Sequence, residues 1–195
     1  MYENYIKIIN QNNGIITAKD AEKNGISRVY LKKMADEGLI QRIEHGIYAT
    51  EKFIYDEYYI FSLKHSNIVF SYNTALYLQD MTERTPTKMD VTIKRNTNLS
   101  AYKDKINLYR VNDDILDLGK CKIKTIYGNI VTAYNLERTV CDIINNKSTI
   151  DIEIANKSIR KCIKSKEFDA NKMFDYAKKM KIYDKIRNYM EAIIW

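Results

Sequence analysis

The chain has 195 residues, of which 45% are hydrophobic and 29% charged, with one proline and six glycines. This composition fits one or two globular domains with a real core, and it excludes a disordered chain, a collagen-like repeat and a Pro/Gly-rich linker. The net charge of +7 favours an anionic partner such as nucleic acid, but residues 1–50 hold only seven basic against six acidic groups, so any basic site depends on where the charges lie.

The first 38 residues predict three helices. An apolar repeat over residues 5–9 predicts the first, and residues 15–16 predict a short strand after it. Residues 17–20, Thr-Ala-Lys-Asp, form a capping box that opens a short second helix. Ser27 is the expected N-cap of a third helix over residues 28–37. A short helix, a tight turn and an exposed helix are the layout of a helix-turn-helix.

The residues that follow predict a β-hairpin. Residues 39–43 alternate apolar and polar, residues 44–46 supply a turn, and residues 47–49 return. A helix-turn-helix followed directly by a hairpin is a winged helix, in which the hairpin is the wing. We therefore predict a winged-helix DNA-binding domain over residues 1–52.

The third helix has the pattern of a DNA-recognition helix. At 100° per residue, Leu31, Met34 and Ala35 share its core face, and Lys32 and Lys33 point away from that face. Basic side chains and a helix N-terminus contact phosphates, and basic side chains also contact the acceptor edge of guanine. The candidate DNA-binding residues are Ser27, Arg28, Tyr30, Lys32 and Lys33 on the helix, with Arg42 and His45 on the wing. The alternative is a winged helix that binds only proteins, with the two lysines as ordinary solvated surface.

Residues 53–195 predict a second domain, of mixed α/β class and ending in helices, so the fold class of the chain is α+β. Helices are expected to begin within residues 51–60 and at residue 71, with a loop over residues 82–88. Alternating patterns predict short, half-buried strands within residues 89–133, at 89–94, 106–111, 122–126 and 129–133. Asn135 caps a helix through residue 144, and three further helices fill the stretch to residue 195.

The last three helices carry two basic faces. Such faces could bind RNA or an acidic protein, and we interpret them as solvated surface. The residues concerned are Lys157, Arg160, Lys161 and Lys164, then Lys178, Lys179, Lys181, Lys185 and Arg187.

The sequence shows few signs of an enzyme. It contains no glycine-rich phosphate loop and no nucleophile elbow, and no Cys or His pair has zinc spacing. Its three cysteines, an odd number at wide spacing, are typical of reduced thiols. Asp90 and Lys94 share a strand face, and Asp113 and Asp114 lie in an expected loop, which leaves a metal-dependent nuclease as an alternative. We expect no catalytic residues, no metal and no cofactor.

Several segments together resemble one family. After the winged helix, residues 46–48 (Gly-Ile-Tyr) close the wing and residues 71–76 (Ser-Tyr-Asn-Thr-Ala-Leu) begin a helix. An Arg-Thr-Pro loop at 84–86 precedes a strand, and Asn-Leu-Glu-Arg-Thr-Val-Cys-Asp follows paired strands at 135–142. This order resembles the AbiE-type abortive-infection antitoxins, the transcriptional-regulator half of a type IV toxin–antitoxin pair.

The resemblance implies a function for each domain. The N-terminal domain would repress its own promoter by binding inverted repeats, with Arg28, Tyr30, Lys32, Lys33 and Arg42 at positions where the family reads DNA. The C-terminal domain would counteract a nucleotidyltransferase toxin that acts on tRNA, without forming a stable complex, and no residue is assigned to that role. Two copies are expected on an inverted repeat, as a dimer or cooperatively.

Two further expectations concern the second domain and the cellular address. Glu137, Arg138 and Asp142 are interpreted as structural, with an i,i+4 pair between Arg138 and Asp142. With no membrane-length apolar stretch and no secretory leader, a cytoplasmic protein is expected. The alternatives are an ordinary winged-helix regulator whose C-terminal domain senses a ligand or partner, and a nucleic-acid enzyme.

Overall fold

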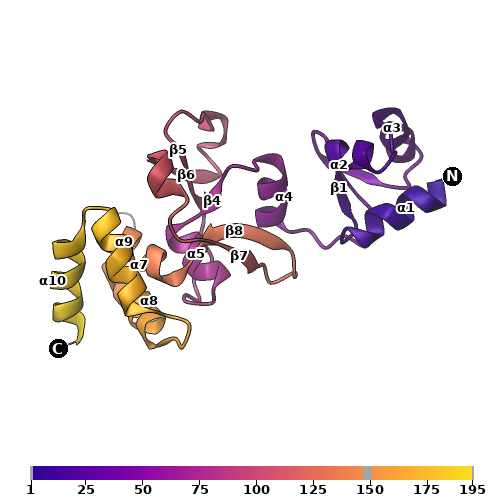
Figure 1. Cartoon of the computed structure of the whole chain (residues 1–195). Coiled ribbons are helices and arrows are strands. Elements are labelled where there is room, and N and C mark those ends of the chain that lie inside the picture. The colour runs from indigo at the N-terminus through magenta and orange to yellow at the C-terminus, as the bar shows by residue number, and fades with distance from the viewer. Residues whose placement is uncertain (1, 147–150, 195) are drawn as a thin grey trace. The chain divides into compact units, whose positions relative to one another are not determined.

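The computed structural model describes residues 2–146 and 151–194, which form helices and two β-sheets of a mixed α+β protein (Figure 1). The chain divides into two compact units, one of Met1–Ser66 with Tyr127–Asn129 and the other of Asn67–Ile126 with Ile130–Trp195. The first unit thus extends past residue 52, the boundary expected from the sequence. The reason is helix α4 (Glu57–Lys64), whose Ile60 packs in one apolar cluster with Ile15 and Ile47.

The first unit begins with three helices and three short strands in the predicted order. The strands form an antiparallel sheet in the order β1-β3-β2, so β3 lies in its middle. The predicted capping box is present, because the Thr17 hydroxyl accepts a hydrogen bond of 3.1 Å from the Asp20 N–H. The elements are α1 (Tyr2–Gln11), β1 (Ile15–Thr17), α2 (Ala18–Lys23), α3 (Arg28–Asp36), β2 (Gln41–Glu44) and β3 (Ile47–Ala49).

The core of this unit confirms the predicted face of α3. Leu31 and Met34 are fully buried, and Ala35 is half-buried beside them. Ile9 of α1 and Ile26, before α3, complete the same cluster. Packing of this stripe holds the opposite face of α3 toward solvent.

The second unit is built on a five-stranded mixed sheet in the order β6-β5-β4-β8-β7. Strands β5 and β6 are parallel, as are β4 and β8, whereas the β4–β5 and β7–β8 pairs are antiparallel. The strands are β4 (Val69–Phe70), β5 (Met89–Lys94), β6 (Ile106–Val111), β7 (Lys120–Lys124) and β8 (Ile130–Tyr134).

Two sequence predictions for this sheet are wrong. Strand β5 is not half-buried, since every residue from Met89 to Ile93 is buried. Its polar side chains can be buried because they form hydrogen bonds inside the unit. The Thr92 hydroxyl, for example, donates to Ser71 Oγ at 2.8 Å. The acidic stretch at 113 is not a loop but a short helix, α6 (Asp113–Leu116), with Asn112 at its N-cap position.

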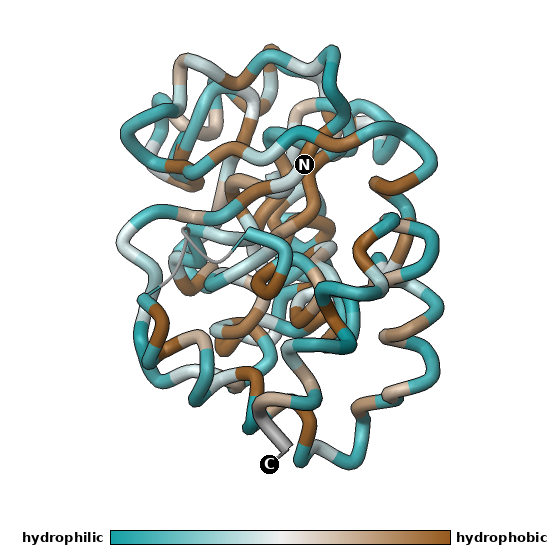
Figure 2. Tube along the Cα trace, turned by 90° about the vertical axis from the view of Figure 1, so that its left-hand side faces the viewer, coloured by the Kyte–Doolittle hydropathy of each residue, from teal (hydrophilic) through white to brown (hydrophobic). Residues whose placement is uncertain are grey.

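Helices complete the second unit in the predicted order. Asn135 caps the fourth-to-last helix, as expected, by accepting from the Arg138 N–H at 3.1 Å. The helices are α5 (Tyr72–Leu78), α7 (Leu136–Asn145), α8 (Ile152–Lys164), α9 (Ala170–Lys179) and α10 (Tyr183–Ile194), with a 3₁₀ turn at Ser100–Tyr102. Hydrophobic and hydrophilic residues alternate in short runs along the trace (Figure 2). No helix among the described residues is long and apolar enough to cross a membrane.

The predicted Arg138–Asp142 pair is confirmed and lies at the centre of a buried polar cluster. Arg138 Nε donates to Asp142 Oδ1 at 2.9 Å, and Arg138 Nη1 donates to the carbonyls of Ile115 and Leu118 at 2.6 and 2.8 Å. The guanidinium also lies 4.2 Å from the centre of the Tyr134 ring. Gly119 is required beside it, because a Cβ there would come within 2.5 Å of Arg138 Cβ.

This cluster predicts a pH dependence of stability. Burial raises the pKa of Asp142 to about 6, against the opposing effect of Arg138, and Asp142 Oδ2 is buried with no hydrogen-bond partner among the described residues. The pKa of an aspartate in the unfolded chain is about 3.9. At pH values between about 4 and 6, Asp142 therefore binds a proton more readily in the folded chain than in the unfolded chain. The free energy of unfolding is therefore expected to fall as the pH rises from about 4 to about 6. In urea titrations the near-isosteric Asp142→Asn variant should lack this fall, and parallel pH profiles would contradict the prediction.

Candidate nucleic-acid interface

Helix α3 presents a basic, solvent-facing side. Lys32 and Lys33 are exposed, and Val29 between them and the helix start is 63% exposed. The first turn of α3 carries no acidic residue, while Asp36 and Glu37 lie at its C-terminal end. Among the basic side chains of α3, Arg28 therefore lies nearest the positive end of the helix dipole, whereas Lys33 lies in the last turn.

Arg28 and Ser27 lie at the N-terminal end of α3. The Arg28 side chain is 72% exposed, and its Nε donates to Glu22 Oε1 of α2 at 2.8 Å. This bond uses one of the five guanidinium donors and orients the others. Ser27 occupies the predicted N-cap position but makes no side-chain capping bond, so its exposed hydroxyl is not used by the helix.

Tyr30 is placed differently from the other candidates. Its side chain is half-buried, and its ring contacts those of Tyr2 and Tyr5, with centroids 6.4 and 5.6 Å away. The ring of Tyr30 thus joins α3 to α1 as part of the packing of the unit. A contact between its hydroxyl and DNA stays a prediction.

The two hairpin candidates lie together. Arg42 Nη2 and His45 Nδ1 are 2.7 Å apart on the exposed β2–β3 hairpin. The nearby carboxylate of Glu44 accepts from Lys64 Nζ of α4 at 2.6 Å, which offsets its negative charge. The sequence does not indicate the Glu44–Lys64 pair or the Arg28–Glu22 pair, because each of them joins two separate elements.

The carboxylates considered for a nuclease are engaged in other contacts. Asp90 is 1% exposed and accepts from the Asn73 N–H at 2.9 Å and from Asn107 Nδ2 at 2.8 Å. Burial raises its pKa. Asp113 forms an exposed pair with Lys94 at 2.9 Å. Among residues 2–146 and 151–194, no group of His, Cys, Asp and Glu side chains is arranged to hold a metal ion.

Comparison with known proteins gives a family match for the first unit. Residues 4–50 match the family described as "Transcriptional regulator, AbiEi antitoxin", which confirms the resemblance over that segment. No curated protein sequence matches the chain.

One similar solved structure is the crystal structure of the RV2827C protein from Mycobacterium tuberculosis. It aligns with a TM-score of 0.51 and 11% sequence identity over 93% of this chain and 75% of that chain. The likeness therefore covers both units, and at this identity it shows the fold alone.

Proposed function

We propose that the first unit is a winged helix-turn-helix that binds DNA, and that the chain is a transcriptional autorepressor and antitoxin of a type IV abortive-infection pair. The observation that carries this proposal is the basic, exposed side of α3, within a segment that matches the AbiEi regulators. The three helices and the β2–β3 hairpin supply the framework that such a domain needs, with α3 as recognition helix and the hairpin as wing.

Each exposed candidate has a defined role in this proposal. Lys32 and Lys33 neutralise phosphates, and Arg28 reads a guanine edge through the guanidinium donors that Glu22 orients. Ser27 binds a phosphate at the N-terminus of α3. Arg42 and His45 contact the DNA backbone or minor groove from the wing.

The target and the second activity follow from the family resemblance. Two copies bind inverted repeats in the chain's own promoter in the cytoplasm, and the second unit counteracts a nucleotidyltransferase toxin without a stable complex. Two copies on one site fit a recognition helix that covers only one half-site.

The proposal is tested by fluorescence-anisotropy titration of the full chain against the DNA upstream of its own gene. We expect saturable binding that is at least about a thousandfold tighter than binding to a random duplex of equal length. The logarithm of the affinity should fall linearly with the logarithm of the salt concentration. Equal affinities for the two duplexes would contradict the proposal and assign the first unit to a protein partner.

A further inference from the structure

The second unit contains a basic groove between the segment that follows α5 and helix α8. Its volume is about 770 Å³. Five cationic side chains and two carboxylates line it, which leaves three net positive charges. The cations are Arg84, Lys157, Arg160, Lys161 and Lys164, and the carboxylates are Glu83 and Glu153.

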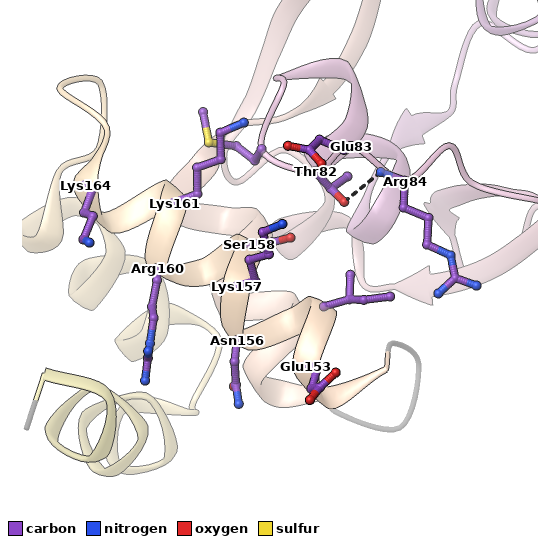
Figure 3. Close-up of a pocket in the computed structure, with 12 residues that line it drawn as sticks. Thr82, Glu83, Arg84, Glu153, Asn156, Lys157, Ser158, Arg160, Lys161 and Lys164 are labelled. Carbon is purple, nitrogen blue, oxygen red and sulfur yellow. Dashed lines mark hydrogen bonds between the residues drawn. The ribbon is translucent and has the colours of Figure 1, made fainter.

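Two of these cations lie on facing walls of the groove. Lys161 extends from α8 toward the 81–84 segment, and Arg84 projects from that segment beside the start of α8 (Figure 3). Lys161 Nζ donates to the Asp80 carbonyl and lies 3.8 Å from Asp80 Oδ2, and these two contacts hold the ammonium at this wall. Met81 and Ile154 are half-buried against the core of the unit and give the groove an apolar surface.

A smaller polar pocket of about 370 Å³ adjoins the groove and shares Arg84 and Ile154 with it. Asn107 lines this pocket, and its Nδ2 donates to Asp90 Oδ1 at 2.8 Å. Asp90 is held in turn by the Asn73 N–H. The Asn107 carboxamide is therefore fixed in orientation, with its Oδ1 as an acceptor.

We propose that the groove and the polar pocket together bind a nucleoside triphosphate. The phosphate chain lies in the groove between Arg84, Lys157 and Lys161, because these side chains supply the charge-assisted donors that phosphate oxygens require. The base enters the polar pocket, where Asn107 Oδ1 accepts from an amino or imino group.

The dimensions favour this ligand over a polymer. Both volumes fall within the roughly 300–1,000 Å³ typical of small-molecule sites. Every residue involved belongs to the second unit, so this inference is independent of DNA binding by the first unit.

The test is isothermal titration of the full chain with ATP, GTP and inorganic triphosphate in the presence of Mg²⁺. We expect one nucleotide per chain, bound more tightly than inorganic triphosphate. The Arg84→Gln/Lys157→Gln/Lys161→Gln variant should lose at least about tenfold in affinity. The matched control, Lys178→Gln/Lys179→Gln/Arg187→Gln, removes equal charge from exposed positions of α9 and α10 and should bind as the wild type does.

Three results would overturn the inference. One is equal affinity for ATP in the groove variant and the matched control, which would indicate general attraction to charge. Another is equal affinity of the wild type for the nucleotides and inorganic triphosphate, which would exclude a site for the base. The third is saturable binding of a single-stranded RNA with no binding of either nucleotide, which would assign the groove to a polymer.

Discussion

Replacing Arg138 with leucine is expected to lower the free energy of unfolding by about 3–5 kcal/mol, because it leaves a buried carboxylate without its partner. The Arg138 and Asp142 side chains are 1% and 7% exposed, so water does not compensate for the loss. The carbonyls of Ile115 and Leu118 lose their donor at the same time. Urea unfolding at neutral pH, followed by far-UV circular dichroism, measures the effect.

A double variant separates the loss of the charge pair from the loss of packing. Arg138→Leu/Asp142→Leu removes both charges, and replacing both partners of a buried pair by apolar groups is often close to neutral. We therefore expect the double variant to be more stable than Arg138→Leu alone. A single variant within about 1 kcal/mol of the wild type would show that the buried pair contributes little.

Local rules predicted this cluster only in part. The spacing of Arg138 and Asp142 and the capping role of Asn135 follow from helix geometry, and both are confirmed. The contacts of Arg138 with residues 115 and 118 join segments about 20 residues apart, and no periodicity encodes them. The same holds for Glu137, which is 2% exposed and accepts from the Asp169 N–H at 3.1 Å.

The sequence pattern does not predict the environment of polar residues that are buried in strand β5. The alternation of residues in Met89–Lys94 predicts one solvated face, but Asp90 and Thr92 are buried. Both side chains form hydrogen bonds with residues of neighbouring elements, which makes their burial possible. Such partners become visible only in the folded chain. The sequence does not predict helix α6, because its four residues are too few to show a helical period.

The sequence predicts the candidate interface best for residues whose exposure depends on the packing of a single helix, α3. The stripe of Leu31 and Met34 fixes which side of α3 is exposed, and Lys32 and Lys33 lie on that side. Tyr30 departs from this pattern because its ring partners come from α1. The sequence predicts solvated surface for the basic face of α8, because it does not show that α8 faces the 81–84 segment.

Replacing Arg28, Lys32 and Lys33 together with alanine is expected to weaken binding to the promoter DNA by about 100-fold or more. Loss of a bidentate contact to guanine costs about 1–3 kcal/mol, and each lost phosphate contact weakens binding further. If all three side chains contact the DNA, the slope of log affinity against log salt should become shallower by about 2–3. The three side chains are exposed, and alanine favours helix, so the fold should be retained.

A charge-matched variant distinguishes a DNA-binding surface from general electrostatic attraction. Lys178→Ala/Lys179→Ala/Arg187→Ala removes the same charge from the second unit and should leave promoter affinity within about threefold of the wild type. Single variants then divide the roles: Lys32→Ala should weaken binding to every sequence alike, whereas Arg28→Ala should relax sequence preference. Equal losses in the two triple variants would mean that net charge, and not the face of α3, determines binding.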